Sequence, residues 1–316
     1  MGKRKFDILC AGLMVYDIHI GPVDESIFTQ DQIRLESIDY ATGGDALNAA
    51  TVASKLGMSV CLGGCIGNDA PGRFLKEQAE KNGVNTDAVY VSEDYKTAVS
   101  VVMRRPDGNR HFAYYGEAND AFDGSTVTDD MLKNSSVLYV ASMMALKGLE
   151  GEPLADLFRR AQSFGTITAM DTTWPKDGIW MPKLEKALKY TDIFIPSGYE
   201  ARELAGETEP EKITAFLHER GVKIAGVKLG KDGAYIEGEY LPAYRCDSIA
   251  DTTGAGDSFM SGFISGIVMG RSVSDSAHLG SAASNACIRR IGATAGAVSL
   301  EEADKITEMH KNGTLK

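Results

Sequence analysis

The sequence predicts an α/β fold in which a mostly parallel central sheet is covered by helices on both faces. Short apolar segments of strand length recur along the chain, and stretches with helical periodicity lie between them. Strands that alternate with helices are typical of a mostly parallel sheet. The predicted strands are Phe6–Gly12, Val60–Leu62, Val137–Val140, Ile167–Met170, Ile193–Ile195 and Ile224–Leu229.

The predicted helices occupy the intervals between these strands. They follow Gly44 and Pro71 and then cover Leu154–Phe164, Ile213–Arg220, Phe259–Met269 and Ala277–Arg290. Neither an internal repeat nor a low-complexity linker is visible, and 316 residues suit one α/β domain with an appendage. We therefore expect residues 1–316 to form a single domain.

Two regions, about 14–40 and 97–116, break the alternation. In the second, Thr97–Arg104 and Arg110–Tyr115 flank Pro106-Asp107-Gly108-Asn109, which is a clear hairpin signal. The mixed polar and apolar pattern of these strands does not suit a core position. We expect a hairpin that stands away from the main sheet.

Composition excludes several classes of function. The formal net charge is −11 and the sequence pI is about 5.0, which argues against a nucleic-acid-binding protein. We see neither a signal peptide nor an apolar run long enough to span a membrane. Five scattered cysteines without a Cys-x-x-Cys pair favour reduced, mostly buried thiols, so we expect a cytoplasmic protein.

The most informative segment is Asp251-Thr252-Thr253-Gly254-Ala255-Gly256-Asp257, which leads into an apolar helical stretch. Small residues at a helix start leave backbone N–H groups uncovered, and these groups can bind a phosphate. An acid beside such a nest would repel phosphate, but it could accept the proton of a hydroxyl that attacks the phosphate. The segment therefore indicates phosphoryl transfer to an alcohol. The alternative is a glycine turn with Asp257 as a helix N-cap.

A second glycine segment runs from Gly43 to Ala50 and reads Gly-Gly-Asp-Ala-Leu-Asn-Ala-Ala. Paired glycines allow the backbone to approach a ligand closely. Asp45 and Asn48 are three residues apart, so they would share a helix face and could bind a polyhydroxylated ligand. The alternative is a turn that starts an Ala-rich helix, with Asn48 solvated.

Together the two segments resemble the two signatures of the ribokinase-like, phosphofructokinase-B type carbohydrate kinase family. The first matches as Gly-Gly-x-Ala-x-Asn-x-Ala, followed by Gly57 and Gly67, and the second as residues 251–257. The resemblance extends over nearly the whole chain. It implies a ribokinase-like α/β fold with a small β-sheet lid, made by the two irregular regions, that closes over the sugar and often pairs between subunits. We therefore expect a homodimer through the lid.

The resemblance also implies roles for particular residues. Asp257 would be the general base, beside an anion hole at Gly254, Ala255 and Gly256. The acceptor would lie at Asp17, Gly43, Gly44, Asp45 and Asn48. ATP would lie at Lys228, Gly230, Gly233, Thr253, Gly254, Gly256 and Asn285. Glu200 would hold Mg²⁺ through water, and Asp251 and Thr253 align with residues that hold a monovalent, potassium-like cation in some relatives.

Several of these positions have ordinary structural explanations as well. The segment Ser197-Gly198-Tyr199-Glu200 resembles the family's Asn-x-x-Glu motif, with Ser197 in place of the usual Asn. Glu200 could equally complement a helix dipole, Gly230 and Gly233 could form a β-turn, and Asn285 could be a core-bonded amide.

The favoured function is an ATP-dependent kinase that phosphorylates a hydroxyl, expected to be a primary one, of a small sugar or polyol. A nucleoside kinase is the alternative on the same fold, and a non-catalytic sugar- or nucleotide-binding protein is a third. Phosphorylated sugars are disfavoured as acceptors because Asp45 would repel a second phosphate. A nicotinamide-dependent oxidoreductase would need Gly-x-Gly-x-x-Gly after the first strand, and residues 11–16 lack it.

Overall fold

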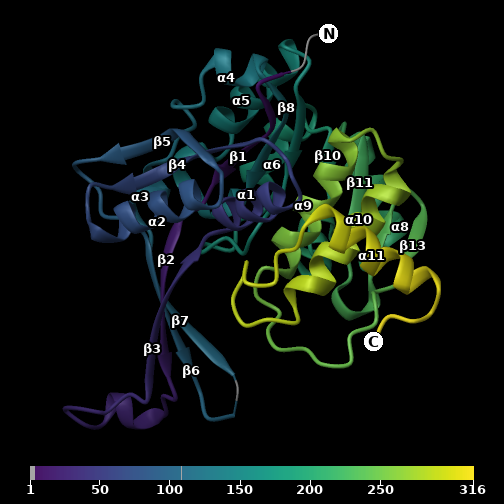
Figure 1. The fold of residues 1–316 in the computed structure, drawn as a ribbon. Coiled ribbons are helices and arrows are strands. Elements are labelled where there is room, and N and C mark those ends of the chain that lie inside the picture. Colours follow the sequence, from purple (N-terminus) through teal and green to yellow (C-terminus); the bar gives the residue numbers. More distant parts are fainter. Residues whose placement is uncertain (1–3, 108) are drawn as a thin grey trace.

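The computed structural model describes residues 4–107 and 109–316. Within this part of the chain, nine strands form one large sheet (Figure 1). All neighbours from β11 to β5 pair in parallel, and β12 and β13 add an antiparallel edge. The order is β13 (Glu239–Leu241), β12 (Ala234–Ile236), β11 (Ile224–Lys228), β10 (Ile193–Phe194), β9 (Ile167–Met170), β8 (Ser135–Ala141), β1 (Phe6–Gly12), β4 (Val60–Gly67) and β5 (Asn85–Ser92).

Helices bury both faces of this sheet because its strands are apolar on both sides. One face, which includes Ile8 and Cys10, packs against α1 (Asp45–Lys55), α2 (Ala70–Lys81), α9 (Ala255–Val268) and α10 (Val273–Cys287). Outside α10 lies α11 (Leu300–Lys311). The other face packs against α3 (Glu117–Ala121), α4 (Asp129–Lys133), α5 (Glu152–Ser163), α6 (Met181–Leu188), α7 (Gly198–Ala205) and α8 (Pro210–Glu219).

A second, four-stranded sheet in the described residues extends away from the large one (Figure 1). Its order is β3 (Ser37–Gly43), β2 (Val15–Gly21), β6 (Val99–Arg104) and β7 (Arg110–Tyr115). The predicted hairpin is confirmed as β6 and β7, although Gly108 of its turn lies outside the described residues. We call this small sheet the lid sheet.

The two faces of the lid sheet differ in chemistry. Cross-strand register places Ile18 beside Tyr40 and Val101, so one face is largely apolar. The same register places Asp17 beside Ser100, and Ser100 beside Tyr114, on the opposite face. That polar face is directed toward the large sheet, since Tyr114 accepts a hydrogen bond from the buried Asn119 amide of α3 at 2.9 Å.

The predicted α/β architecture is confirmed, and the differences lie at element ends. The helix predicted from Phe259 begins at Ala255, because Gly254 adopts a left-handed conformation and serves as its N-cap. The strand predicted to end at Leu62 continues to Gly67, since Gly63 and Gly64 remain in the sheet. None of the described helices has both the length and the apolar content needed to cross a bilayer.

Candidate active site

The candidate site lies at the carboxyl ends of the parallel strands. From β1 the chain goes to β4 on one side and later returns as β8 on the other, so the strand order reverses there. In open α/β sheets, ligands bind at such a point. Gly12 ends β1, Ser142 follows β8, Asp171 follows β9 and Lys228 ends β11.

Asp257 lies in the first turn of α9 and is 8% exposed. It is the third helical residue, so the alternative that it is the N-cap is wrong; Gly254 holds that position with φ 77°. A Cβ at Gly254 would lie 2.4 Å from the Ala293 carbonyl oxygen, which makes glycine necessary there.

The backbone of this turn can bind an anion. The Ala255 N–H donates to the Thr252 carbonyl at 3.2 Å. The N–H groups of Gly256 and Asp257 have no acceptor among the residues that the structure describes. Uncovered N–H groups at the positive end of a helix are suited to a phosphate group. The predicted glycine nest is therefore present, with two of its N–H groups available.

A hydrogen bond joins the two glycine motifs. Asn48 of α1 is buried, and its Nδ2 donates to Asp257 Oδ2 at 2.9 Å. The solvated alternative for Asn48 is thus wrong. Its Oδ1 is buried without a partner in the described part of the chain, so it can still accept a hydrogen bond from a hydroxyl.

Asp17 and Asp45 lie on the lid side of Asp257. A Cβ at Gly43 would lie 2.2 Å from Asp17 Oδ2, so a larger residue there would collide with this carboxylate. The hydroxyl of Ser142 donates to Asp45. Burial, followed by the charge of Asp45, raises the pKa of Asp17 to about 7. Gly44, with φ 89°, packs closely against the Leu13 carbonyl.

An ion pair between Lys228 and Asp171 occupies the centre of the site. Burial and then the charge of Asp45 raise the pKa of Asp257 well above its usual range, while Lys228 and the Asn48 hydrogen bond lower it. Burial also raises the pKa of Asp45 and Asp171, and Lys228 lowers both. One ammonium group therefore moderates the charge of several carboxylates.

Glu200 both stabilises the start of a helix and lies in the candidate site. With Ser197 it forms a capping box at the start of α7, and its Oε2 also accepts from Thr172 Oγ1 at 3.2 Å. Burial and then the Asp171 charge raise the pKa of Glu200 to about 7. The alternative, that Glu200 is an acid in the first turn of a helix, is confirmed. Glu200 nevertheless lies in the site, because it contacts Thr172 and is close to Asp171.

A magnesium ion that arrives with a nucleotide is compatible with this geometry. Among the described residues no group of three or more His, Cys, Asp and Glu side chains is arranged to hold a metal. Mg²⁺ usually needs only one or two carboxylates, because waters and substrate phosphates complete its coordination. The assignment of Mg²⁺ to Glu200 stays a prediction.

A cavity of about 540 Å³ adjoins the first turn of α9. This volume is in the range of small-molecule sites. It is lined by five of the residues predicted for the nucleotide, Lys228, Gly230, Gly233, Gly256 and Asn285, and by the half-buried Cys246. Thr253 and Gly254 do not line it; their neighbours Thr252 and Ala255 do.

Asn285 is a bonded amide at the cavity wall. Its Nδ2 donates to the carbonyls of Tyr244 and Arg245 at 3.3 and 3.1 Å, and its Oδ1 accepts from Arg289. These bonds hold the loop that forms one side of the cavity. The alternative of a bonded amide is confirmed for Asn285, and its contact with a nucleotide stays a prediction.

Arg110 of the lid sheet reaches the second glycine motif. Its Nη1 donates to Asp251 Oδ1 at 2.8 Å and also contacts the Thr253 hydroxyl. The same Asp251 oxygen accepts from Thr253 N and Oγ1 at 2.9 and 2.8 Å. Asp251 and Thr253 are thus bonded to each other and to Arg110, and a monovalent cation at these two residues stays a prediction.

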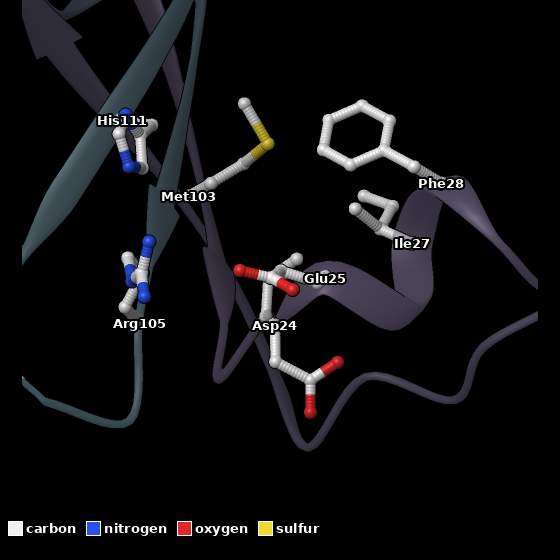
Figure 2. A pocket seen from close by; sticks show the side chains of 8 residues that line it. Asp24, Glu25, Ile27, Phe28, Met103, Arg105 and His111 are labelled. Atoms are coloured by element: carbon white, nitrogen blue, oxygen red, sulfur yellow. The ribbon is translucent and has the colours of Figure 1, made fainter.

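A second cavity, of about 240 Å³, lies at the far tip of the lid sheet (Figure 2). Met103, Ile27 and the 85% exposed Phe28 surround it, together with Arg105 and His111. None of the predicted site residues lines it. It is therefore separate from the candidate site.

Sequence reasoning missed Asp171, Ser142 and Arg110 as site residues. A polar residue directly after a predicted parallel strand was the available signal for Asp171 and Ser142. Nothing local marks Arg110, because its contact joins residues 141 positions apart.

Comparison with known proteins decides the family. The sequence profile described as pfkB family carbohydrate kinase matches residues 5–300. The chain belongs to the pfkB family of carbohydrate kinases.

The relatives within this family differ in their named substrates. The ATP-dependent 6-phosphofructokinase of Thermoanaerobacterium thermosaccharolyticum is 25% identical over 97% of this chain and 94% of that protein. The 2-dehydro-3-deoxygluconokinase of Bacillus subtilis is 27% identical over 79% of this chain and 81% of that protein. Arabidopsis thaliana ribokinase, solved with ribose and ATP, superposes with a TM-score of 0.81 at 24% identity and covers 96% of this chain and 99% of that one. The predicted ribokinase-like fold is confirmed.

The raised carboxylate pKa values predict that the acidic limb in the pH profile of kcat/KM lies at a higher pH than ordinary carboxylates would give. Raised pKa values keep these groups protonated to higher pH, so kinase activity should fall as the pH drops below about 7, the value for Asp17 and Glu200. Steady-state rates from pH 4.5 to 9 check this. The variant Asp45→Asn should move the limb to lower pH, because the Asp45 charge raises the pKa of Asp17 and Asp257. A wild-type limb near pH 4 would contradict the prediction.

Proposed function

We propose that this protein is an ATP-dependent kinase that phosphorylates a hydroxyl, preferably a primary one, of a small neutral sugar or polyol. One observation carries the proposal: buried Asp257 adjoins the free N–H groups at the start of α9 and is held by Asn48 of the other glycine motif. A proton acceptor and an anion site are thereby placed next to each other. Phosphoryl transfer to an alcohol needs both.

In the proposed mechanism, Asp257 accepts the proton of the acceptor hydroxyl as that oxygen attacks the terminal phosphorus of ATP. Asn48 orients the carboxylate through its hydrogen bond. The free N–H groups of the first turn, at Gly256 and Asp257, stabilise the charge of the transferring group. A raised pKa makes the Asp257 carboxylate, once it is ionised, a stronger base than an exposed aspartate.

The acceptor is proposed to lie between the lid sheet and α1. Asp17, Asp45 and the free Asn48 oxygen can accept hydrogen bonds from sugar hydroxyls, while Gly43 and Gly44 keep the space beside them clear. Two carboxylates on this side favour a neutral acceptor over an anionic one. The named substrates of the relatives do not decide between these, since one is a phosphorylated sugar and another a sugar acid.

The nucleotide is proposed to occupy the 540 Å³ cavity, with its phosphates toward Gly256. Gly230 leaves room for it along one wall, and Asn285 supports the loop at Tyr244 and Arg245. Glu200 would hold Mg²⁺ through water, and the bound ion would neutralise phosphate charge.

The first test is acceptor-dependent ADP formation. Purified protein with ATP and magnesium should release ADP in the presence of a sugar or polyol from a panel that also contains nucleosides and sugar phosphates. Asp257→Asn should lower kcat by roughly 10²–10⁴-fold while ATP still binds, because the base is lost and the fold is kept. Asp275→Asn, at the exposed first turn of α10, is the matched control. A normal kcat for Asp257→Asn would refute the assignment of the base.

A second test separates the acceptor side from the nucleotide side. Asp17→Ala should raise the KM for the acceptor by roughly 10- to 100-fold, which corresponds to a charged hydrogen bond of about 1.5–3 kcal/mol. The KM for ATP in the same variant is the internal control and should change little. Equal increases in both constants would contradict the division.

We further propose that the lid sheet closes over the acceptor and pairs with a second copy of the chain. Its apolar face leaves Ile38 52% and Tyr40 56% exposed, and exposed apolar patches of this kind mark interaction surfaces. Its polar face carries Asp17 toward the site. Exclusion of water by a lid would protect the phosphoryl group from hydrolysis.

Light scattering should therefore give a mass near twice 33.9 kDa. Tyr40→Glu should shift the protein toward monomer, because it places a charge in the apolar face, whereas Tyr90→Glu, at an exposed site on the large sheet, should not. A wild-type monomer would refute the dimer alone. Closure is tested separately: proteolysis between Pro106 and Asn109 should slow when both acceptor and nucleotide are present.

A further inference from the structure

Lys228 is a largely buried lysine at the end of β11, with its side chain 12% exposed. It forms an ion pair with Asp171, whose side chain is 8% exposed. A buried ammonium is costly unless it is paired, so the pair explains why Lys228 stays charged. It does not explain why the chain places a lysine here, since two apolar residues would fill the same space at lower cost.

The surroundings of Lys228 carry an excess of negative charge. Burial lowers its pKa, but Asp171, Glu200 and Asp257 raise it to a greater extent, so Lys228 remains an ammonium. Asp45 is a fourth carboxylate whose pKa Lys228 lowers. Asp171 directly follows β9, and the other three acids belong to α7, α9 and α1. Lys228 is therefore the cation shared by the carboxylates of both halves of the site.

The ammonium is directed toward the anion site. A Cβ at Gly256 would have Lys228 Nζ as its neighbour at 3.6 Å, and both residues line the nucleotide cavity. Gly256 thus leaves a direct path between Nζ and the first turn of α9. An ammonium has three N–H donors, and the pair with Asp171 uses part of this capacity. The remainder is available to phosphate oxygens.

We propose that Lys228 is a catalytic residue that binds the transferring phosphoryl group, and that Asp171 is a positioning residue that holds its ammonium. This inference rests on the proposed function. In the step, the acceptor oxygen forms a bond to the terminal phosphorus, and the bond from that phosphorus to the bridging oxygen breaks, with its electron pair leaving on ADP. The acceptor proton goes to Asp257. Lys228 stays protonated and neutralises charge on the phosphoryl oxygens throughout.

The test uses Lys228→Met in the full-length protein, with ATP, magnesium and the acceptor found in the screen. kcat should fall by about 10²–10³-fold, the usual effect of removing one group that stabilises transition-state charge, while the acceptor KM changes less than threefold. Lys223→Met is the matched control, because it removes a Lys–Asp pair with Asp192 at an exposed position outside the site. Should Lys228→Met fail to fold, Lys228→Gln, which retains a donor for Asp171, replaces it.

A purely structural ion pair would give a different result. In that case Lys228→Met would reduce the melting temperature but leave kcat within threefold of wild type, which would overturn the proposal. Asp171→Asn adds an independent readout. Because Asp171 is the strongest of the charges that raise the pKa of Lys228, its loss should move the basic limb of the pH profile to lower pH. An unmoved limb would overturn the role of Asp171.

The two levels of the proposal can fail separately. If wild-type protein releases no ADP with any acceptor in the panel, the proposed function fails. If wild type is active and Asp257→Asn is inactive while Lys228→Met retains its kcat, only the inference about Lys228 fails.

Discussion

The ion pair between Lys228 and Asp171 is the interaction on which the rest of the site depends. Parallel strands end at the same edge of the sheet, and here that edge gathers Asp171, Glu200, Asp45 and Asp257. Such a group of buried carboxylates is unfavourable unless some are protonated or a cation lies among them. Lys228 supplies that cation, and loss of one partner of a buried pair typically costs about 3–5 kcal/mol.

Close backbone approaches give the site its shape. Gly43 leaves room for the Asp17 carboxylate, and Gly254 lets the start of α9 pack against Ala293. Because the backbone turns so tightly before Ala255, the first residues of α9 line the 540 Å³ cavity and Asp257 reaches Asn48. The glycines of the two motifs in this chain thus reflect a requirement for space.

The sequence was sufficient for features that depend on local pattern. The alternation of strands and helices predicted the large sheet, and the two glycine motifs predicted which residues would surround Asp257. Contacts between distant segments could not be predicted in this way. Arg110 meets Asp251 only because β7 of the lid sheet comes close to the segment before α9, and Ser142 meets Asp45 only because β8 neighbours β1. Such contacts depend on tertiary arrangement, which no short motif specifies.

The position of Cys246 has a practical consequence. It lines the cavity proposed for the nucleotide and is half-buried, whereas Cys10, Cys61, Cys65 and Cys287 are buried. A maleimide dye will therefore react first at this one thiol, without any cysteine having to be introduced or removed. The label would stand at the mouth of the cavity, where its fluorescence would report whether a nucleotide is present. Cys246 is thus a site at which a fluorescent dye could be attached to follow ligand binding in this cavity.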